Sequence, residues 1–86
     1  MEVFRTKGFQ KAYDKLAKIP KAKVDKALAL YIADRTNPVL CDHPLKGNMK
    51  GLRSFSAAWD LRIIYREEGN FLTVILIDVG SHNQVY

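Results

Sequence analysis

The sequence predicts an α+β fold in which a helical hairpin packs on a mostly antiparallel, four-stranded sheet, in the order β-α-α-β-β-β. Residues 7–36 repeat apolar side chains at the three-to-four-residue spacing of amphipathic helices. Residues 51–79 hold three runs rich in β-branched and aromatic residues. The chain has 86 residues, the length of one small domain, and we expect residues 1–86 to form it.

The first half of the chain predicts one strand and the two helices. "MEVFRT" reads as a short strand, and residues 8–19 read as a helix whose apolar stripe is Phe9, Ala12, Tyr13 and Leu16. Lysines occupy the opposite face of that helix, at positions 7, 11, 15 and 18. Pro20 suits the first turn of a second helix over 21–36. Asn37 before Pro38 ends that second helix.

The second half predicts three strands in an antiparallel meander. Residues 51–58, 59–68 and 71–79 are the strands, and Gly69-Asn70 makes the turn between the last two. The run "FLTVILIDV" is apolar at nearly every position, which indicates an interior strand. The position of the first strand in the sheet stays open. The closing "SHNQVY" reads either as irregular chain or as a single helical turn.

Composition restricts the class of protein. Cys41 is the single cysteine, so an internal disulfide is excluded and a reducing compartment fits. No apolar run approaches 18 residues, and the start "MEVFRTKGF" lacks the apolar segment of a signal peptide. These features predict a cytoplasmic protein.

Charge is distributed unevenly along the chain. The net charge is +5, and residues 1–54 hold 12 Lys and Arg against 5 Asp and Glu, whereas residues 55–86 hold 2 against 4. A basic surface attracts polyanions such as RNA through phosphate contacts and counterion release. It attracts an acidic protein partner equally well, and a solvated lysine-rich helix face is the third interpretation.

Polar residues suited to catalysis or ligand binding lie in the loop 41–54 and at the ends of the last two strands. Because the hairpin is antiparallel, the start of its first strand lies beside the end of its second, so Asp60 and Arg62 are expected near His82. The candidates are His43, Lys46, Lys50, Arg53, Asp60, Arg62, His82 and Tyr86.

Two histidines among several cations suit RNA cleavage by the RNA's own 2′-hydroxyl. Histidine titrates near neutral pH and serves as base or acid, and Lys or Arg stabilises the charge of a pentavalent phosphate. A tyrosine stacks a base or positions a proton. No metal or other cofactor is needed for this reaction, and a metal site from Cys41, Asp42, His43 and His82 is poorly spaced.

Each candidate also has a structural interpretation. His43 before Pro44 caps a loop, His82 is an exposed residue near the end of the chain, and Asp60 caps a turn or pairs with Arg62. The loop lysines are then solvated side chains. Trp59 is expected to anchor the core or a sheet edge rather than to stack on a base.

Three motifs in order resemble the RelE/ParE superfamily of type II toxin–antitoxin toxins, and its YafQ branch most. The motifs are "DHPLKGNMKGLRS", "WDLRIIYR" and "VGSHNQVY". The resemblance implies a RelE-like fold and a metal-independent endoribonuclease that cuts mRNA, typically at the ribosomal A site, and is silenced by a cognate antitoxin. It implies proton-transfer roles for His43 and His82, an active-site Asp60 and a closing aromatic Tyr86. Phosphate-binding cations then correspond to Lys46, Lys50, Arg53 and Arg62.

The sequence departs from the YafQ pattern before and after the aspartate. Ser56 stands near the place of a further histidine, and Leu61 stands where those enzymes carry a tryptophan, with Trp59 preceding Asp60 instead. Either the arginines take over part of the missing histidine's role, or activity is reduced.

Two other functions fit the same fold. One is a ParE-like toxin that inhibits DNA gyrase through protein contacts, and the other is a basic domain that binds RNA without cutting it. For the antitoxin, the lysines of the first helix and any groove between helix and sheet are candidate contacts for an acidic segment that folds on binding.

Overall fold

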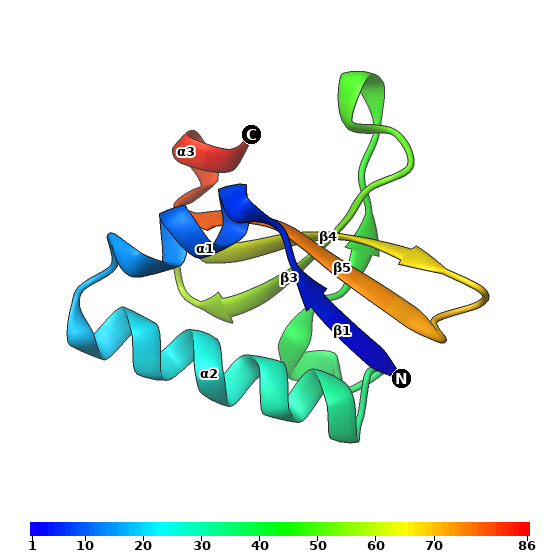
Figure 1. Ribbon diagram of the computed structural model, residues 1–86, viewed down its shortest axis with the longest axis horizontal. Coiled ribbons are helices and arrows are strands. Elements are labelled where there is room, and N and C mark those ends of the chain that lie inside the picture. The colour runs from blue at the N-terminus through cyan, green and yellow to red at the C-terminus, as the bar shows by residue number, and fades with distance from the viewer.

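The computed structural model describes residues 1–86 as a five-stranded sheet with two helices on one face and a short third helix on the other (Figure 1). The strands are β1 Glu2–Arg5, β2 His43–Pro44, β3 Arg53–Ala58, β4 Leu61–Glu68 and β5 Thr73–Gly80. The helices are α1 Lys7–Asp14, α2 Lys18–Ala33 and α3 His82–Val85, and two 3₁₀ turns, η1 Pro38–Leu40 and η2 Gly47–Met49, lie in the connections. The α+β class is therefore confirmed.

The sheet has the order β1-β5-β4-β3-β2. Strands β3, β4 and β5 form the expected antiparallel meander, and β1 joins it in parallel beside β5, with Val3 opposite Val74. Strand β5 thus has a neighbour on each side, in agreement with its apolar sequence. The structure settles the position of the first strand, which the sequence left open.

The expectation of four strands is wrong by one, because the loop 41–54 contains β2. This strand pairs antiparallel with β3 through His43 opposite Ser54 and Pro44 opposite Arg53. Two residues cannot display a period of two, and proline cannot donate to the ladder, so no sequence pattern marks the strand.

Helix α1 is shorter than predicted, and α2 keeps its predicted length but begins and ends three residues earlier, at Lys18 and Ala33. Helix α1 starts at a Thr6 cap, whose Oγ1 accepts a hydrogen bond from the Phe9 amide at 3.1 Å. It ends at Asp14 rather than at residue 19, because α2 begins at Lys18 and needs Lys15 to Ala17 as the connection. Pro20 lies in the first turn of α2, as predicted.

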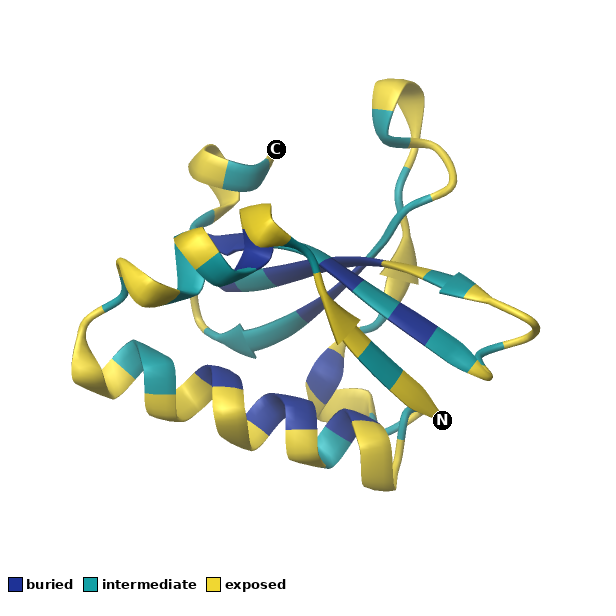
Figure 2. Cartoon of the chain, viewed as in Figure 1, coloured by how far each residue is buried: buried dark blue, intermediate teal, exposed yellow.

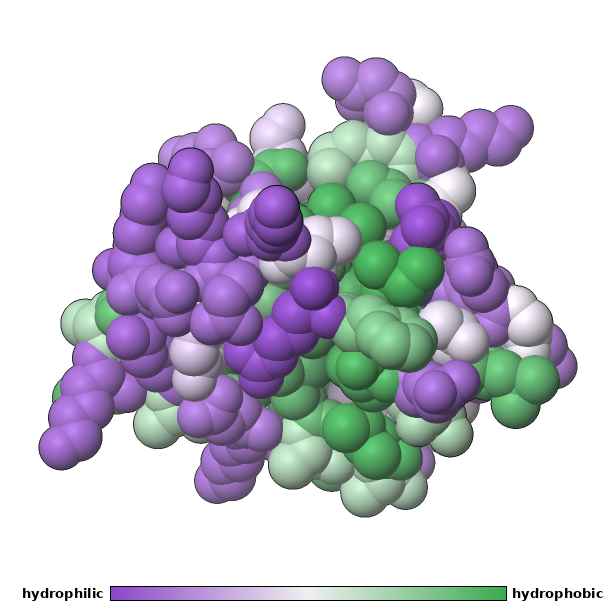
Figure 3. Space-filling view, viewed as in Figure 1, coloured by the Kyte–Doolittle hydropathy of each residue, from purple (hydrophilic) through white to green (hydrophobic).

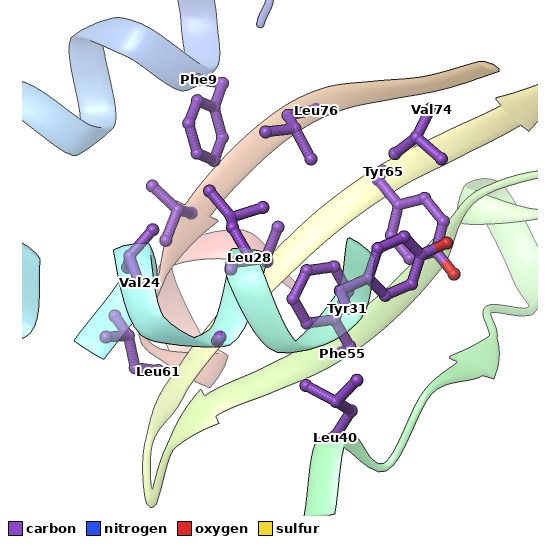
Figure 4. Packing of buried hydrophobic residues seen from close by; sticks show 13 residues of the cluster. Phe9, Val24, Leu28, Tyr31, Leu40, Phe55, Leu61, Tyr65, Val74 and Leu76 are labelled. Atoms are coloured by element: carbon purple, nitrogen blue, oxygen red, sulfur yellow. The ribbon is translucent and has the colours of Figure 1, made fainter. Parts of the chain in front are cut away.

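The core lies between the helices and one face of the sheet, where buried residues line the inner sides of α2, β4 and β5 (Figure 2). Tyr31 of α2 stacks on Phe55 with ring centroids 4.6 Å apart, and Tyr65 meets both rings edge-on (Figure 4). Burial of each such side chain stabilises the fold by about 1.5–3 kcal/mol. The cluster comprises Phe9, Val24, Ala27, Leu28, Tyr31, Leu40, Phe55, Leu61, Ile63, Tyr65, Val74, Leu76 and Val79.

Trp59 is not an anchor, and that expectation is wrong. Trp59 is 94% exposed, because it forms the turn between β3 and β4 together with Asp60 and does not start a strand. Strand β4 begins only at Leu61, which takes the core position instead. The indole therefore projects from the end of the sheet.

The second face of the sheet also buries side chains. Ser54 and Ile64 are opposite each other in β3 and β4 and are buried there, outside the main core. Helix α3 and the loop 45–52 both rise from this side, whereas α2 lies on the other (Figure 1). The closing residues thus form the helical turn that was one of the two expectations. None of the helices has the length and apolar character that crossing a membrane requires.

Candidate active site

Helix α3 presents His82 at the edge of the second face. The amide of Ser81 donates a hydrogen bond to Gln84 Oε1 at 2.8 Å, and the amide of His82 donates to Asp60 Oδ1 at 3.1 Å. The expected proximity of Asp60 and His82 is therefore found. Asp60 fixes the backbone of His82, while the imidazole of His82 is exposed and free to meet a ligand.

Tyr86 links α3 to the centre of the sheet. Its ring packs edge-on against the His82 ring, with centroids 4.5 Å apart. Its hydroxyl donates a hydrogen bond to the buried Ser54 Oγ at 2.6 Å. Ser54 was not among the sequence candidates, because a lone serine within a strand carries no motif.

His43 lies on the same face through its pairing with Ser54. Residues directly opposite in an antiparallel pair point to the same side, so His43 and the serine that holds Tyr86 are neighbours. His43 Nδ1 lies 2.8 Å from the carbonyl oxygen of Cys41. A carbonyl only accepts, so in this hydrogen bond Nδ1 carries the proton, and in the neutral ring Nε2 keeps its lone pair.

Arg62 braces the turn that carries Asp60. Its Nη1 donates to Ser56 Oγ at 3.3 Å and to the carbonyl oxygens of Ala58 and Trp59, each at 3.2 Å. Arg62 also pairs with Gly80, two residues before His82. The guanidinium thus occupies the space beside Ser56, at the position where the sequence departs from the YafQ pattern.

The loop lysines stand at the far side of this face from α3. Lys46 and Lys50 are exposed and flank η2 in the loop that rises from β2 and β3, with Gly47 and Gly51 at positive φ. In the space-filling view, hydrophilic side chains cover this loop and the side of the molecule that carries α1, with apolar surface between them (Figure 3). The loop therefore offers cations to an anionic ligand lying across the face.

The structure does not bring Arg53 to the other candidates. Arg53 Nε donates to Tyr65 Oη at 3.1 Å, and Nη2 donates to Asp42 Oδ2 at 3.2 Å. Tyr65 belongs to the main core, so Arg53 points to the face opposite Ser54 and Tyr86. Asp42 turns the same way, and no cluster of three or more His, Cys, Asp or Glu side chains is placed to hold a metal ion.

The packing of Gly80 leaves little room for a side chain at the junction of β5 and α3. A Cβ at this position would lie 2.8 Å from Gln84 Oε1 and 3.2 Å from Gln84 Cβ. Because that oxygen accepts the Ser81 amide, Gly80→Ala is expected to displace α3 and to shift the NMR resonances of His82 and Tyr86. Gly8→Ala is the control, since its Cβ would have no contact closer than 3.4 Å and alanine favours a helix. Unchanged His82 and Tyr86 resonances in Gly80→Ala would contradict the prediction.

The whole chain matches one family model. That family is described as the bacterial toxin of a type II toxin–antitoxin system, YafQ, and the match spans residues 1–86. The chain belongs to the YafQ family. The superfamily resemblance that the three motifs indicated is therefore confirmed. No curated protein matches the chain.

Solved structures of similar toxins share the fold. YafQ from E. coli strain BL21(DE3) is 21% identical, with a TM-score of 0.82 over 99% of this chain and 97% of that one. A chain of the E. coli DinJ-YafQ toxin-antitoxin complex is 22% identical, with a TM-score of 0.79 over 99% and 96%. The YoeB/ParE toxin from Agrobacterium tumefaciens is 20% identical, with a TM-score of 0.77 over 95% and 99%. This chain is thus a type II toxin with a YafQ fold.

Proposed function

We propose that this YafQ-family toxin is an endoribonuclease that cuts mRNA in the ribosomal A site and thereby stops translation. The observation that carries the proposal is the shared face of His43 and His82, joined through Ser54 and Tyr86 and flanked by Lys46 and Lys50. A toxin that only blocks a target needs no pair of exposed proton-transfer groups.

The reaction uses the RNA's own 2′-hydroxyl as nucleophile. His43 Nε2 takes the 2′-OH proton, the 2′ oxygen forms a bond to phosphorus, and the bond from phosphorus to the 5′ oxygen breaks. His82 donates a proton to that leaving oxygen, which gives a 2′,3′-cyclic phosphate and a 5′-hydroxyl end. Lys46 and Lys50 stabilise the added negative charge on the phosphate, and Arg62 contributes through the part of its guanidinium that does not hold the turn. Tyr86 orients His82 through the contact between their rings.

The deciding experiment is inducible expression of the wild type with primer extension on a reporter mRNA. New 5′ ends within codons, absent from a His43→Ala/His82→Ala double variant, are the expected result. Arrested growth without new ends, accompanied by DNA damage and filamentation, would instead indicate gyrase inhibition of the ParE kind. Harmless expression with salt-dependent RNA binding would indicate a domain that only binds RNA.

The cognate antitoxin is the proposed protein partner, and an apolar groove beside α2 suits it. The groove runs between α2 and the outer edge of β3, with Leu30, Val39, Ala57 and Trp59 among its lining residues. Lys23 and Lys26 line the same groove and are exposed. Strand β2 pairs only with Arg53 and Ser54 of β3. Beyond Ser54, no strand pairs with this outer edge of β3. These features fit an extended segment with apolar and acidic side chains.

Truncation of Trp59 tests this groove. Trp59→Ala is expected to weaken binding of the cognate antitoxin about tenfold or more, because a large aromatic side chain buried in a contact is a typical hot spot. Leu72→Ala is the matched control, since Leu72 is 69% exposed in the turn between β4 and β5 and does not line the groove. Calorimetric titration with the antitoxin measures both variants, and equal affinities for the two would exclude the groove as the contact.

A further inference from the structure

Asp42 is a nearly buried carboxylate that the catalytic proposal does not use. Its side chain is 8% exposed, and each of its oxygens has a partner. Oδ1 accepts a hydrogen bond from Tyr65 Oη at 2.6 Å, and Oδ2 accepts one from Arg53 Nη2 at 3.2 Å. Because Arg53 Nε also donates to Tyr65 Oη, the three side chains form a closed triangle.

A second arginine ties this triangle to the end of α2. Arg35 Nη1 lies 3.9 Å from Asp42 Oδ2, and the Arg35 guanidinium lies over the Phe71 ring at 3.6 Å from its centroid. Phe71 has a φ of +70° in the turn after β4. Asp42 and its two arginines therefore connect the segment after α2, the β4–β5 turn and the start of β2.

Tyr65 and Arg53 both keep their protons at neutral pH. Burial raises the pKa of Tyr65, and its hydrogen bond to Asp42 raises it further, so the tyrosine stays a donor. Burial lowers the pKa of Arg53, but the hydrogen bonds with Asp42 and Tyr65 outweigh burial and raise it overall, so the guanidinium stays charged. A buried hydrogen-bonded carboxylate with charged donors is a strong local anchor.

Strand β2 needs such an anchor because it is too short to set its own register. It has two ladder pairs, and a shift of one residue would turn His43 to the other face of the sheet. Asp42 directly precedes His43, and alternate residues of a strand point to opposite faces. Holding the Asp42 carboxylate on the core side thus directs His43 towards Ser54 and Tyr86.

We propose that Asp42 is a positioning residue, which the Tyr65–Arg53–Arg35 cluster holds so that His43 faces the active site. Its importance for catalysis rests on the proposed ribonuclease function. Arg53 then acts from behind the sheet, through Asp42, and not on the phosphate. The direction of His43 itself is a structural property and can be measured without RNA.

Two variants disturb the anchor, and one neighbouring variant is the control. Asp42→Asn keeps the size but places amide hydrogens or a neutral oxygen against two arginines, and Tyr65→Phe removes one donor while the ring stays packed. Tyr31→Phe is matched to the latter, because Tyr31 lies in the same aromatic cluster, whereas the hydroxyl that donates to Asp42 belongs to Tyr65. The measurements are the imidazole NMR resonances of His43, the kcat and KM for cleavage of a model mRNA bound to ribosomes, and thermal unfolding.

Asp42→Asn and Tyr65→Phe are expected to shift the His43 resonances and to lower kcat about 10- to 100-fold well below the melting temperature, whereas Tyr31→Phe leaves both unchanged. If Asp42→Asn does not fold, Tyr65→Phe gives the answer alone. Unchanged His43 resonances and kcat in a folded Tyr65→Phe variant with a lower melting temperature would overturn the inference. Shifted resonances in a protein that cuts no RNA would support the anchor and refute the ribonuclease proposal.

Discussion

His82→Ala is expected to lower the rate of mRNA cleavage by about 100-fold or more, the usual contribution of one positioned proton donor. The imidazole is exposed, at the edge of the face that also carries His43. Its backbone, not its ring, makes the hydrogen bond to Asp60. Removal of the ring therefore takes away the proton donor while the helical turn keeps its attachment to the β3–β4 turn.

The stability of His82→Ala should fall only modestly. The only ring contact with a defined geometry is the edge-on packing with Tyr86, and such a pair contributes about 0.5–1.5 kcal/mol. Because about 1 kcal/mol corresponds to about 4–8 °C in a domain of this size, the melting temperature is expected to fall by about 2–12 °C. Asn83→Ala is the matched control, because Asn83 is the next residue on α3 and is exposed. Cleavage of a ribosome-bound model mRNA by the purified proteins gives the rate, and thermal unfolding gives the melting temperature. Cleavage by His82→Ala at the Asn83→Ala rate would remove His82 from the mechanism.

The sequence predicted those elements of the fold in which apolar residues recur at a regular spacing along the whole element. The stripe of α1, the apolar side of α2 and the three-strand meander each repeat a pattern over a full element, so local rules suffice. The parallel contact of β1 with β5 joins residues about 70 positions apart and leaves no local signal. Strand β2 has only two residues, too few to show an alternating pattern. Trp59 is apolar but lies in a turn, and the strand pattern does not reveal where that turn starts.

The candidate site divides in the same way. The antiparallel hairpin argument placed Asp60 and Arg62 beside the segment that carries His82, and the structure brings them together. The same argument did not consider Arg53, which alternates with Ser54 along β3 and therefore shares the core face of Phe55. Ser54 and Asp42 were not singled out, since their importance comes from one hydrogen bond to Tyr86 and from a cluster of buried donors, which only three-dimensional packing creates.

His43→Ala is expected to reduce cleavage as strongly as His82→Ala but to change the pH dependence in the opposite way. With Nδ1 donating to Cys41, Nε2 of neutral His43 is the available base, so its protonation reduces the rate on the acidic side of the optimum. Loss of His43 should therefore abolish the acidic limb of the pH–rate profile. Loss of His82, the proposed acid, should abolish the alkaline limb, because deprotonation of that group then no longer matters.

Chemical rescue separates proton transfer by His43 from a structural role. Because His43 is exposed, added imidazole can reach the space that the alanine variant leaves. Recovery of cleavage that grows with the concentration of neutral imidazole is the expected result, and the rescued reaction should regain its acidic limb. The same pH profile in both single variants would reverse or remove the assigned roles, whereas absence of rescue with altered Ser54 and Tyr86 resonances would mean that His43 maintains the site rather than moving a proton within it.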